Sequence, residues 1–372
     1  MNWRPTRLEV NLNSIRTNYT RIRKHVGGAR VIAVVKANAY NVGALPAAWA
    51  LRSVGADFFA VATPDEALSL RDGGITDPVL VLGASPYDVA AEYVRSGIRA
   101  ALTDTAMLHV LADAARQSGK PARVHLKVDT GLGRIGFRPD EALRVVDAVR
   151  SLPEVELEGI FTHFIASDSG DLTVTHEQYR IFVDLLKTIA AKGISIPMRH
   201  CCNSGGTLET PEYALDAVRP GHLLFGMYPT PEVKRAIPLE PCMEFKTAVA
   251  ALRDLPPGSG VSYGSAYVTS GQERFAVLPL GYADGYYREL YTKGVEVLIR
   301  GKRCPVAGKI CMDQTMVNVS HLDDVVVGDE VVLVGRQGEE MISLEEMAQK
   351  LGTLICVFPT LLGARVPRVY KD

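Results

Sequence analysis

The first long apolar run of the chain reads VIAVVKANAY at residues 31–40 and carries a lysine, Lys36, at the end of its apolar part. A run that is apolar on both faces is typical of a strand in a parallel sheet with helices on either side. A helix-like segment, PAAWALRSVG (46–55), follows and closes on glycine, as helix caps prefer. The pair predicts one strand–helix unit of an α/β fold.

The same unit recurs along the first two-thirds of the chain. Helical periodicity returns, for example, at residues 63–74, 140–152 and 176–193. Eight such units over about 225 residues match a (β/α)8 barrel, which typically has about 250 residues. An open doubly wound sheet is the competing arrangement. The candidate strands are VIAVVKA (31–37), FFAVAT (58–63), PVLVLG (78–83), RAALTD (99–104), RVHLKVDT (123–130), LEGIFTHF (157–164), MRHCCNS (198–204) and DAVRPGHLLFG (216–226).

The pattern changes after Pro238. Strand-like runs now alternate with Pro-Pro-Gly, Gly-Lys and Gly-Asp turns, and no helical period returns before SLEEMAQKLG (343–352). A strand-like alternation near Leu8 lies outside the barrel count. We therefore expect an α/β + all-β chain. An N-terminal (β/α)8 TIM-type barrel would span residues 12–238, and a C-terminal β-barrel-like domain, predominantly of strands, would combine residues 1–11 and 239–372.

Composition and charge narrow the class of protein. The 372 residues are 47% hydrophobic and 22% charged, with a net charge of −1, so no nucleic-acid or anionic-membrane partner is expected. No apolar run approaches the roughly 20 residues of a membrane span, and no signal-peptide pattern opens the chain. A cytoplasmic protein with reduced thiols is expected. None of the cysteines has CxxC spacing, so no metal site is predicted. They are Cys201, Cys202, Cys242, Cys304, Cys311 and Cys356.

Chemically active side chains gather where the predicted strands end. Lys36 would be poorly solvated there, which suits an imine-forming amine, although a surface lysine is the competing interpretation. Arg134, in the Gly-rich loop 127–137, could clamp a carboxylate or be a solvated loop arginine. His163 ends the sixth strand and could be a core histidine. Lys127 lies inside an apolar strand, where it needs a partner or a modification that removes its charge.

The loops after the seventh and eighth strands are the usual phosphate site of such barrels. They read HCCNSGG (200–206) and RPGHLLFG (219–226). Ser204, and backbone N–H groups after Asn203 and around Gly221 and His222, could cradle a phosphate. In the second domain, Gly-rich turns carry Tyr263, Tyr282, Met312 and Asp313.

In this order and spacing the motifs resemble the alanine racemase family, from VVKANAY (34–40) to RVPRVY (365–370). These enzymes use pyridoxal 5′-phosphate (PLP) and combine an N-terminal barrel with a C-terminal β domain. The resemblance implies that Lys36 holds PLP as a Schiff base and moves a proton on one face of the substrate Cα. Tyr263, from the other subunit of a homodimer, would act on the opposite face. The implied reaction is racemisation of L-alanine to D-alanine for peptidoglycan.

The resemblance also implies binding roles. Arg134 would hold the cofactor's phenolic oxygen and the substrate carboxylate, which the backbone of Met312 from the partner subunit would also reach. Arg219, buttressed by His200, would donate to the pyridine nitrogen and leave it unprotonated, because an arginine does not readily release a proton. The remaining expected residues are Tyr40, His163, Asn203, Ser204, Gly221, His222 and Tyr282 at the cofactor, Asp313 at the substrate, and Lys127 as the family's carbamylated lysine.

Four positions depart from the family pattern. Asn41 and Val42 replace a Gly-His pair after Tyr40, and Phe225 replaces a tyrosine. Cys356 stands where the family carries a tyrosine that narrows the substrate entrance, which favours, as an alternative, a serine or broad-specificity racemase. Two further alternatives are a PLP decarboxylase, which would place an acid at the pyridine nitrogen, and a non-catalytic PLP-binding protein, which would need no β domain.

Overall fold

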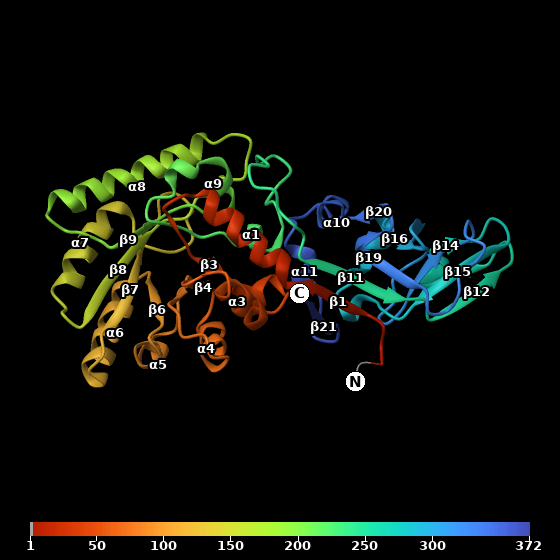
Figure 1. Cartoon of the computed structure of the whole chain (residues 1–372), viewed down its shortest axis with the longest axis horizontal. Coiled ribbons are helices and arrows are strands. Elements are labelled where there is room, and N and C mark those ends of the chain that lie inside the picture. The colour runs from red at the N-terminus through yellow and green to blue at the C-terminus, as the bar shows by residue number, and fades with distance from the viewer. Residues whose placement is uncertain (1–2) are drawn as a thin grey trace. The chain divides into compact units, whose positions relative to one another are not determined.

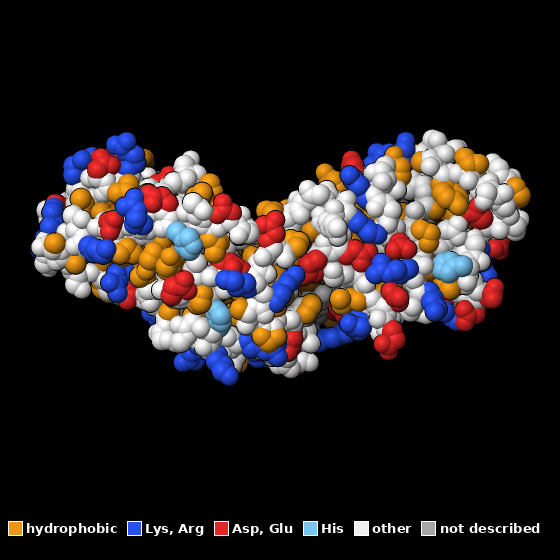
Figure 2. Space-filling view, turned by 90° about the horizontal axis from the view of Figure 1, so that it is seen from above, with side chains coloured by type: hydrophobic (Ala, Val, Ile, Leu, Met, Phe, Trp, Pro, Cys, Tyr) orange, Lys and Arg blue, Asp and Glu red, His pale blue; other side chains and the backbone are white. Residues whose placement is uncertain are grey.

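The computed structural model describes residues 3–372, which form two compact units. One unit spans Ser14–Glu240. The other combines the segment that ends at Asn13 with Pro241–Asp372. No helix within residues 3–372 is long and apolar enough to cross a membrane. Figure 2 shows acidic and basic side chains interspersed over the face that it presents.

The Ser14–Glu240 unit is built on a parallel sheet in the order β2-β10-β9-β8-β7-β6-β5-β4-β3. Figure 1 shows helices α3 to α8 outside these strands. The strands are β2 (Arg30–Val31), β3 (Ala33–Val34), β4 (Phe59–Val61), β5 (Val79–Val81), β6 (Arg99–Leu102), β7 (Ala122–Lys127), β8 (Val155–Phe161), β9 (Met198–His200) and β10 (Ala217–Val218).

The sheet closes on itself because β2 and β3 are two halves of one extended segment. The Ile32 N–H donates to the Val218 carbonyl on one side (2.9 Å), and the Ala33 N–H donates to the Phe58 carbonyl on the other (2.8 Å). Residues 30–34 thus pair with both β10 and β4. All eight predicted strands are present, and the expected (β/α)8 barrel is confirmed.

The helices follow the strands, with caps of the predicted kind. Thr63 caps α4 in a capping box with Glu66, and Asp104 caps α6 by accepting from the Met107 N–H at 2.8 Å. Gly97 and Gly119 end α5 and α6 in the left-handed conformation. The helices are α1 (Leu12–His25), α3 (Ala44–Arg52), α4 (Pro64–Asp72), α5 (Ala90–Ser96), α6 (Thr105–Ser118), α7 (Pro139–Arg150), α8 (Thr173–Ala191) and α9 (Ser204–Glu209).

The second unit is mainly strands, as expected. The segment near Leu8 forms β1 (Arg7–Asn11), which pairs antiparallel with β11 and parallel with β21. A seven-stranded sheet also contains β16, β17, β19 and β20, and a three-stranded sheet and a two-stranded sheet complete the unit. The remaining elements are β11 (Met243–Ala248), β12 (Ala251–Leu255), β13 (Gly260–Val261), β14 (Tyr267–Val268), β15 (Glu273–Leu278), β16 (Glu296–Ile299), β17 (Lys302–Pro305), β18 (Thr315–Asn318), β19 (Glu330–Gln337), β20 (Glu340–Ile342), β21 (Arg368–Lys371), α10 (Leu344–Leu351) and α11 (Val357–Leu361).

Candidate active site

The carboxyl ends of the barrel strands bring several predicted residues to one rim, where active sites of this fold lie. The pKa of half-buried His163 reflects the charges gathered there. Burial lowers the pKa of His163 well below its usual value, and the positive charges of Arg219, Arg134, Lys127 and Lys36 lower it further. Lys127 ends β7 and Arg134 lies in the loop after it, whereas Lys36 and Arg219 follow β3 and β10. The structure thus collects cations from three parts of the barrel around one imidazole. The rim is therefore positively charged and suited to anionic groups.

Lys36 lies just beyond the first strand rather than within it, because β3 ends at Val34. It opens the element α2 (Lys36–Tyr40), in which the residues after Lys36 are left-handed. Ala37, Asn38, Ala39, Tyr40 and Asn41 all have φ between 52° and 74°. No glycine is present, so this left-handed turn is held against its intrinsic preference.

Two polar side chains hold the left-handed turn in place. The Glu66 carboxylate accepts from the Ala37 N–H at 2.6 Å and from the Ala62 N–H at 2.8 Å, which ties the ends of two neighbouring strands together. The Asn38 side chain accepts from the Ala44 N–H at 2.8 Å, at the start of α3. The direction of the turn at Lys36 is thus fixed by contacts on both sides.

A small polar cradle lies beside this turn. A Cβ on Gly221 would stand only 2.1 Å from the Tyr40 hydroxyl, and the Ser204 hydroxyl accepts from the Gly221 N–H at 3.0 Å. The Tyr40 and His222 rings meet edge to face with centroids 5.2 Å apart. Burial, together with the positive charge of Lys36, lowers the pKa of His222 to about 4, so the imidazole is neutral at pH 7. Hydroxyls and backbone N–H groups around a glycine suit a phosphate.

Asn203 has a structural role in the cradle. Its side-chain oxygen accepts from the Gly206 N–H at 3.0 Å, which caps α9, and from the Ser167 hydroxyl at 2.6 Å. Its amide donates to the Phe164 carbonyl at 3.2 Å. Asn203 therefore orients the loop that carries Ser204.

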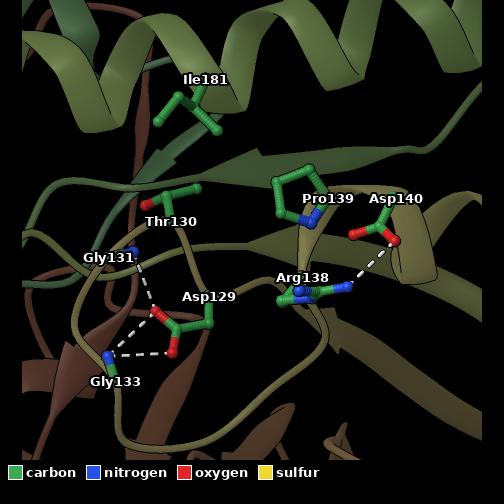
Figure 3. A pocket seen from close by; sticks show the side chains of 8 residues that line it. All are labelled: Asp129, Thr130, Gly131, Gly133, Arg138, Pro139, Asp140 and Ile181. Atoms are coloured by element: carbon green, nitrogen blue, oxygen red, sulfur yellow. Dashed lines mark hydrogen bonds and ion pairs between the residues drawn. The ribbon is translucent and has the colours of Figure 1, made fainter.

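The loop that carries Arg134 is tied down at its base by Asp129. The Asp129 carboxylate accepts from the N–H groups of Gly131 (2.9 Å), Leu132 (2.8 Å) and Gly133 (2.9 Å). Figure 3 shows Asp129 at this turn, beside a pocket of about 440 Å³ that reaches Arg138 and Asp140. Arg134 itself is exposed. The loop is a rigid support for an accessible guanidinium.

Lys127 is only 2% exposed, and its ammonium donates to the Val128 carbonyl at 2.7 Å. Burial lowers the pKa of Lys127 to about 8, with Arg219 and Arg134 contributing by repulsion. A lysine with this pKa has an appreciable neutral fraction at pH 7. The expected burial of Lys127 is confirmed.

Arg219 is buried and surrounded by acceptors. Its guanidinium donates to His200 Nδ1 (2.8 Å), the Thr162 carbonyl (2.7 Å) and the Cys201 carbonyl (3.1 Å). Burial lowers the pKa of Arg219 to about 10, so it remains cationic at neutral pH. Because Arg219 only donates, His200 Nδ1 must be an acceptor and His200 Nε2 must carry the proton.

The hydrogen-bond chain that fixes the tautomer of His200 extends to two residues that sequence reasoning missed, His125 and Glu158. His200 Nε2 donates to His125 Nδ1 at 2.8 Å, which leaves the proton of His125 on Nε2, 3.5 Å from Glu158. Arg99 holds Glu158 in a bidentate pair at 2.8 and 3.1 Å. The signal for this arrangement in the sequence was the glycine at position 159. A Cβ at Gly159 would lie 2.3 Å from His125 Nδ1, so His125 needs a glycine there.

We expect Glu158→Gln to lower the free energy of unfolding by about 2–3 kcal/mol at pH 7. Burial alone raises the pKa of Glu158, but His125 and Arg99 offset this and lower the pKa from 4.5 to about 2. A depressed folded-state pKa stabilises above the unfolded value, and the contribution is lost as the pH falls from about 4.5 to about 2. Urea unfolding of the unaltered chain and of Glu158→Gln at several pH values measures this difference in the free energy of unfolding. A difference that stayed constant down to pH 3 would contradict it.

In the strand-rich unit, Tyr282, Met312 and Asp313 lie on adjoining turns. The Cys311 carbonyl accepts from the Tyr282 N–H at 3.1 Å, and the Met312 carbonyl accepts from the Ala283 N–H at 3.0 Å. Arg365 pairs with Asp313 at 2.8 Å. The Tyr263 turn joins this group through Ser262, whose hydroxyl lies 3.5 Å from Cys311 Sγ.

Tyr263 is 65% exposed and Met312 is 52% exposed. Cys356 is half-buried at the start of α11. Among residues 3–372, no group of three or more His, Cys, Asp or Glu side chains is arranged to hold a metal ion. The structure thus gathers the predicted residues into two sets, one in each unit.

Known proteins share both units. Residues 10–229 match the model of the alanine racemase N-terminal domain, and residues 242–370 match the C-terminal domain. Alanine racemase 2 of Caldanaerobacter subterraneus subsp. tengcongensis is 43% identical over 99% of this chain and 95% of its own length. An alanine racemase of Clostridium perfringens is also 43% identical, over 99% of this chain and 96% of its own.

Solved structures agree with the sequence relatives. The crystal structure of an alanine racemase from Bacillus anthracis with bound L-Ala-P superposes with a TM-score of 0.94 at 34% identity. That match covers 100% of this chain and 96% of the other. Both domain models, the full-length relatives and the superposition lead to one conclusion: this chain belongs to the alanine racemase family.

Proposed function

We propose that this chain is a PLP-dependent racemase that interconverts L-alanine and D-alanine. The observation that carries the proposal is the meeting of Lys36, on a rigid left-handed turn, with the Tyr40–Ser204–Gly221 cradle at one rim of the barrel. An amine beside an anion cradle fits a cofactor that has both an aldehyde and a phosphate. The family relationship supports the same cofactor.

The residues present fit PLP. Because Gly221 has no Cβ, the Tyr40 hydroxyl can approach its backbone. The Tyr40 and Ser204 hydroxyls would hold the phosphate, with Asn203 orienting Ser204 and His222 lining the cradle. Bound PLP supplies an aldehyde that condenses with an amine and an electron-withdrawing ring that acidifies the Cα proton of the substrate. His163 and Tyr282 would line the cofactor, and Arg219 would donate to its ring nitrogen.

Racemisation needs a proton-moving group on each face of Cα. Lys36 would serve one face, and Tyr263 of the partner subunit would serve the other, in a homodimer with shared sites. The exposure of Tyr263 supports this role, because a phenol that acts in another subunit's site must be accessible. Arg134, together with Met312 of the partner subunit and Asp313, would hold the substrate carboxylate. We further propose a cytoplasmic role in supplying D-alanine for peptidoglycan.

Lys127 would act as a carbamate. Its neutral amine would attack carbon dioxide, forming one N–C bond and releasing one proton, which turns a buried cation into an anion. Its lowered pKa and the repulsion from Arg134 and Arg219 favour the change. The anion would then hold Arg134 in place.

Alanine is the proposed substrate, and the serine or broad-specificity alternative is not favoured. The full-length relatives named above are alanine racemases at 43% identity. The test is chiral analysis of the holoenzyme with L-alanine and, separately, L-serine. D-Alanine should form faster, despite Cys356. A larger kcat/KM for serine would refute the substrate, and formation of neither D-amino acid would refute the reaction.

We expect Gly221→Ala to weaken PLP binding by about 10- to 100-fold, since overpacking costs about 1–3 kcal/mol. The new Cβ would stand 2.1 Å from the Tyr40 hydroxyl and would push this hydroxyl out of the cradle. Titration of the apoprotein with PLP, followed by absorbance, measures the affinity. Gly271→Ala is a matched control, because a Cβ at Gly271 meets nothing within 4 Å. Unchanged affinity in Gly221→Ala would place the phosphate elsewhere.

A further inference from the structure

Ser262, the residue before Tyr263, has a backbone conformation that only glycine adopts readily. Its φ is 64° and its ψ is −178°. A side chain in this region is strained and persists only where surrounding contacts impose it. Gly264 and Ser265 follow with φ of 69° and 49°, so Tyr263 is enclosed by residues in unusual conformations. The turn is built to a particular shape.

A side-chain anchor imposes the conformation of Ser262. Its hydroxyl donates to the Lys309 carbonyl and lies 3.5 Å from Cys311 Sγ. The Lys309 segment can approach because residue 308 is glycine. A Cβ on Gly308 would lie 2.9 Å from Ser262 Cβ and 2.7 Å from the Val261 carbonyl oxygen. The strained backbone and the hydrogen bond that holds it therefore belong to the same residue, Ser262.

The anchor matters because Tyr263 has little else to orient it. Its side chain is 65% exposed, so few packed neighbours fix its direction. The flanking strands β13 and β14 pair through only two residues each. The direction of the Tyr263 Cα–Cβ bond thus depends on the backbone at Ser262. On the far side of the turn, Lys309 Nζ would lie 3.5 Å from a Cβ on Gly264, so Lys309 approaches both flanks of Tyr263.

We infer that Ser262 is a positioning residue, whose strained backbone and hydroxyl anchor aim the Tyr263 phenol for proton transfer. The inference rests on the proposed role of Tyr263. A serine is used rather than a glycine because only the side chain can bond to the Lys309 carbonyl. The strain is retained because relaxing it would turn the phenol away from its working direction.

The test compares Ser262→Ala and Ser262→Gly in the holoenzyme. Both lose the hydroxyl, but only glycine removes the steric strain. Ser262→Gly should therefore have the higher thermal midpoint of the two. Both should racemise alanine about 10- to 100-fold more slowly than the unaltered chain, because small misplacements of reacting groups have effects of this size. Ser259→Ala, which removes a hydroxyl bonded to the Pro256 carbonyl in a neighbouring turn, is the matched control and should behave as the unaltered chain.

Isotope effects distinguish a misoriented Tyr263 from a general loss of activity. With alanine deuterated at Cα, loosening Tyr263 slows only one of the two proton transfers. The substrate isotope effect should rise for the enantiomer from which Tyr263 removes the deuteron. It should fall for the other, because Tyr263 then returns a solvent proton. Equal changes for both enantiomers, or none in either variant, would overturn the positioning role. If Ser262→Ala does not fold, Ser262→Gly alone decides.

Tyr263→Phe separates this inference from the proposal on which it rests. If Tyr263→Phe racemises at full rate, the proposed role of Tyr263 fails. If Tyr263→Phe is inactive but the Ser262 variants leave both isotope effects unchanged, only the inference about Ser262 fails. Hydrogen exchange of the apoprotein gives an independent readout. Protection over residues 260–266 should fall in Ser262→Ala and remain unchanged in Tyr263→Phe.

Discussion

The Lys36→Ala variant should lose the visible absorbance of bound PLP and should racemise alanine at least about 10³-fold more slowly. The substitution removes the amine that would hold the cofactor and the group that would move a proton on one face of Cα. The turn itself should survive, because it is held by Glu66 and Asn38 through backbone N–H groups. Spectra of the purified protein and chiral analysis of the product provide the two measurements.

Covalent attachment can be located directly. After reduction with borohydride, mass spectrometry of peptides should find PLP on the peptide that contains Lys36 and on no other. Lys187→Ala is the matched control, since Lys187 is an exposed lysine on α8 that pairs with Asp184 at 3.1 Å. It should keep full colour and activity. Retention of both by Lys36→Ala would refute the proposed role of Lys36.

The barrel was predictable because each of its strands and helices has a recognisable pattern in its own short stretch of sequence. A strand covered on both faces is largely apolar, so most of the eight strands left a continuous run in the sequence, although β9 (Met-Arg-His) did not. The β1 strand near Leu8 was also recognisable from its alternation, because its pattern did not fit the strand–helix repeat. The closure of the barrel could not be predicted from local sequence patterns. It depends on residues 30–34 sharing their hydrogen bonds between β4 and β10, which lie far apart in sequence.

The fine geometry of the site was not predictable for a related reason. Nothing in KANAY suggests a left-handed turn, since alanine prefers negative φ and the segment has no glycine. The turn is imposed by Glu66, which is 29 residues from Ala37. The sequence placed Lys36 correctly near a strand end but could not reveal how it is held. Ser262 is similar, because its anchor at Lys309 is 47 residues away.

The Arg219→Glu variant should racemise alanine about 10²-fold more slowly and should produce more pyruvate for each D-alanine formed. Arg219 offers only donors, so a ring nitrogen facing it would stay unprotonated and the cofactor would withdraw electrons weakly. A carboxylate at this position would instead favour a protonated nitrogen. A cofactor that withdraws electrons more strongly would more often take up the amino group of alanine, and the remaining carbon skeleton would leave as pyruvate. Chiral chromatography and a pyruvate assay on the same samples give the ratio.

The effect of Arg219→Glu should extend to the buried histidines. With an acceptor at residue 219, His200 Nδ1 must donate, so the proton order of His200 and His125 reverses unless one of them becomes protonated. Reversal would turn an unprotonated His125 Nε2 toward the Glu158 carboxylate, which is unfavourable because both groups are acceptors. Burial lowers the pKa of both histidines, so protonation is unfavourable as well. Arg219→Lys, which keeps a cationic donor, should also be slow but should form no extra pyruvate. If both variants formed pyruvate equally, loss of packing rather than the donor character of Arg219 would be responsible.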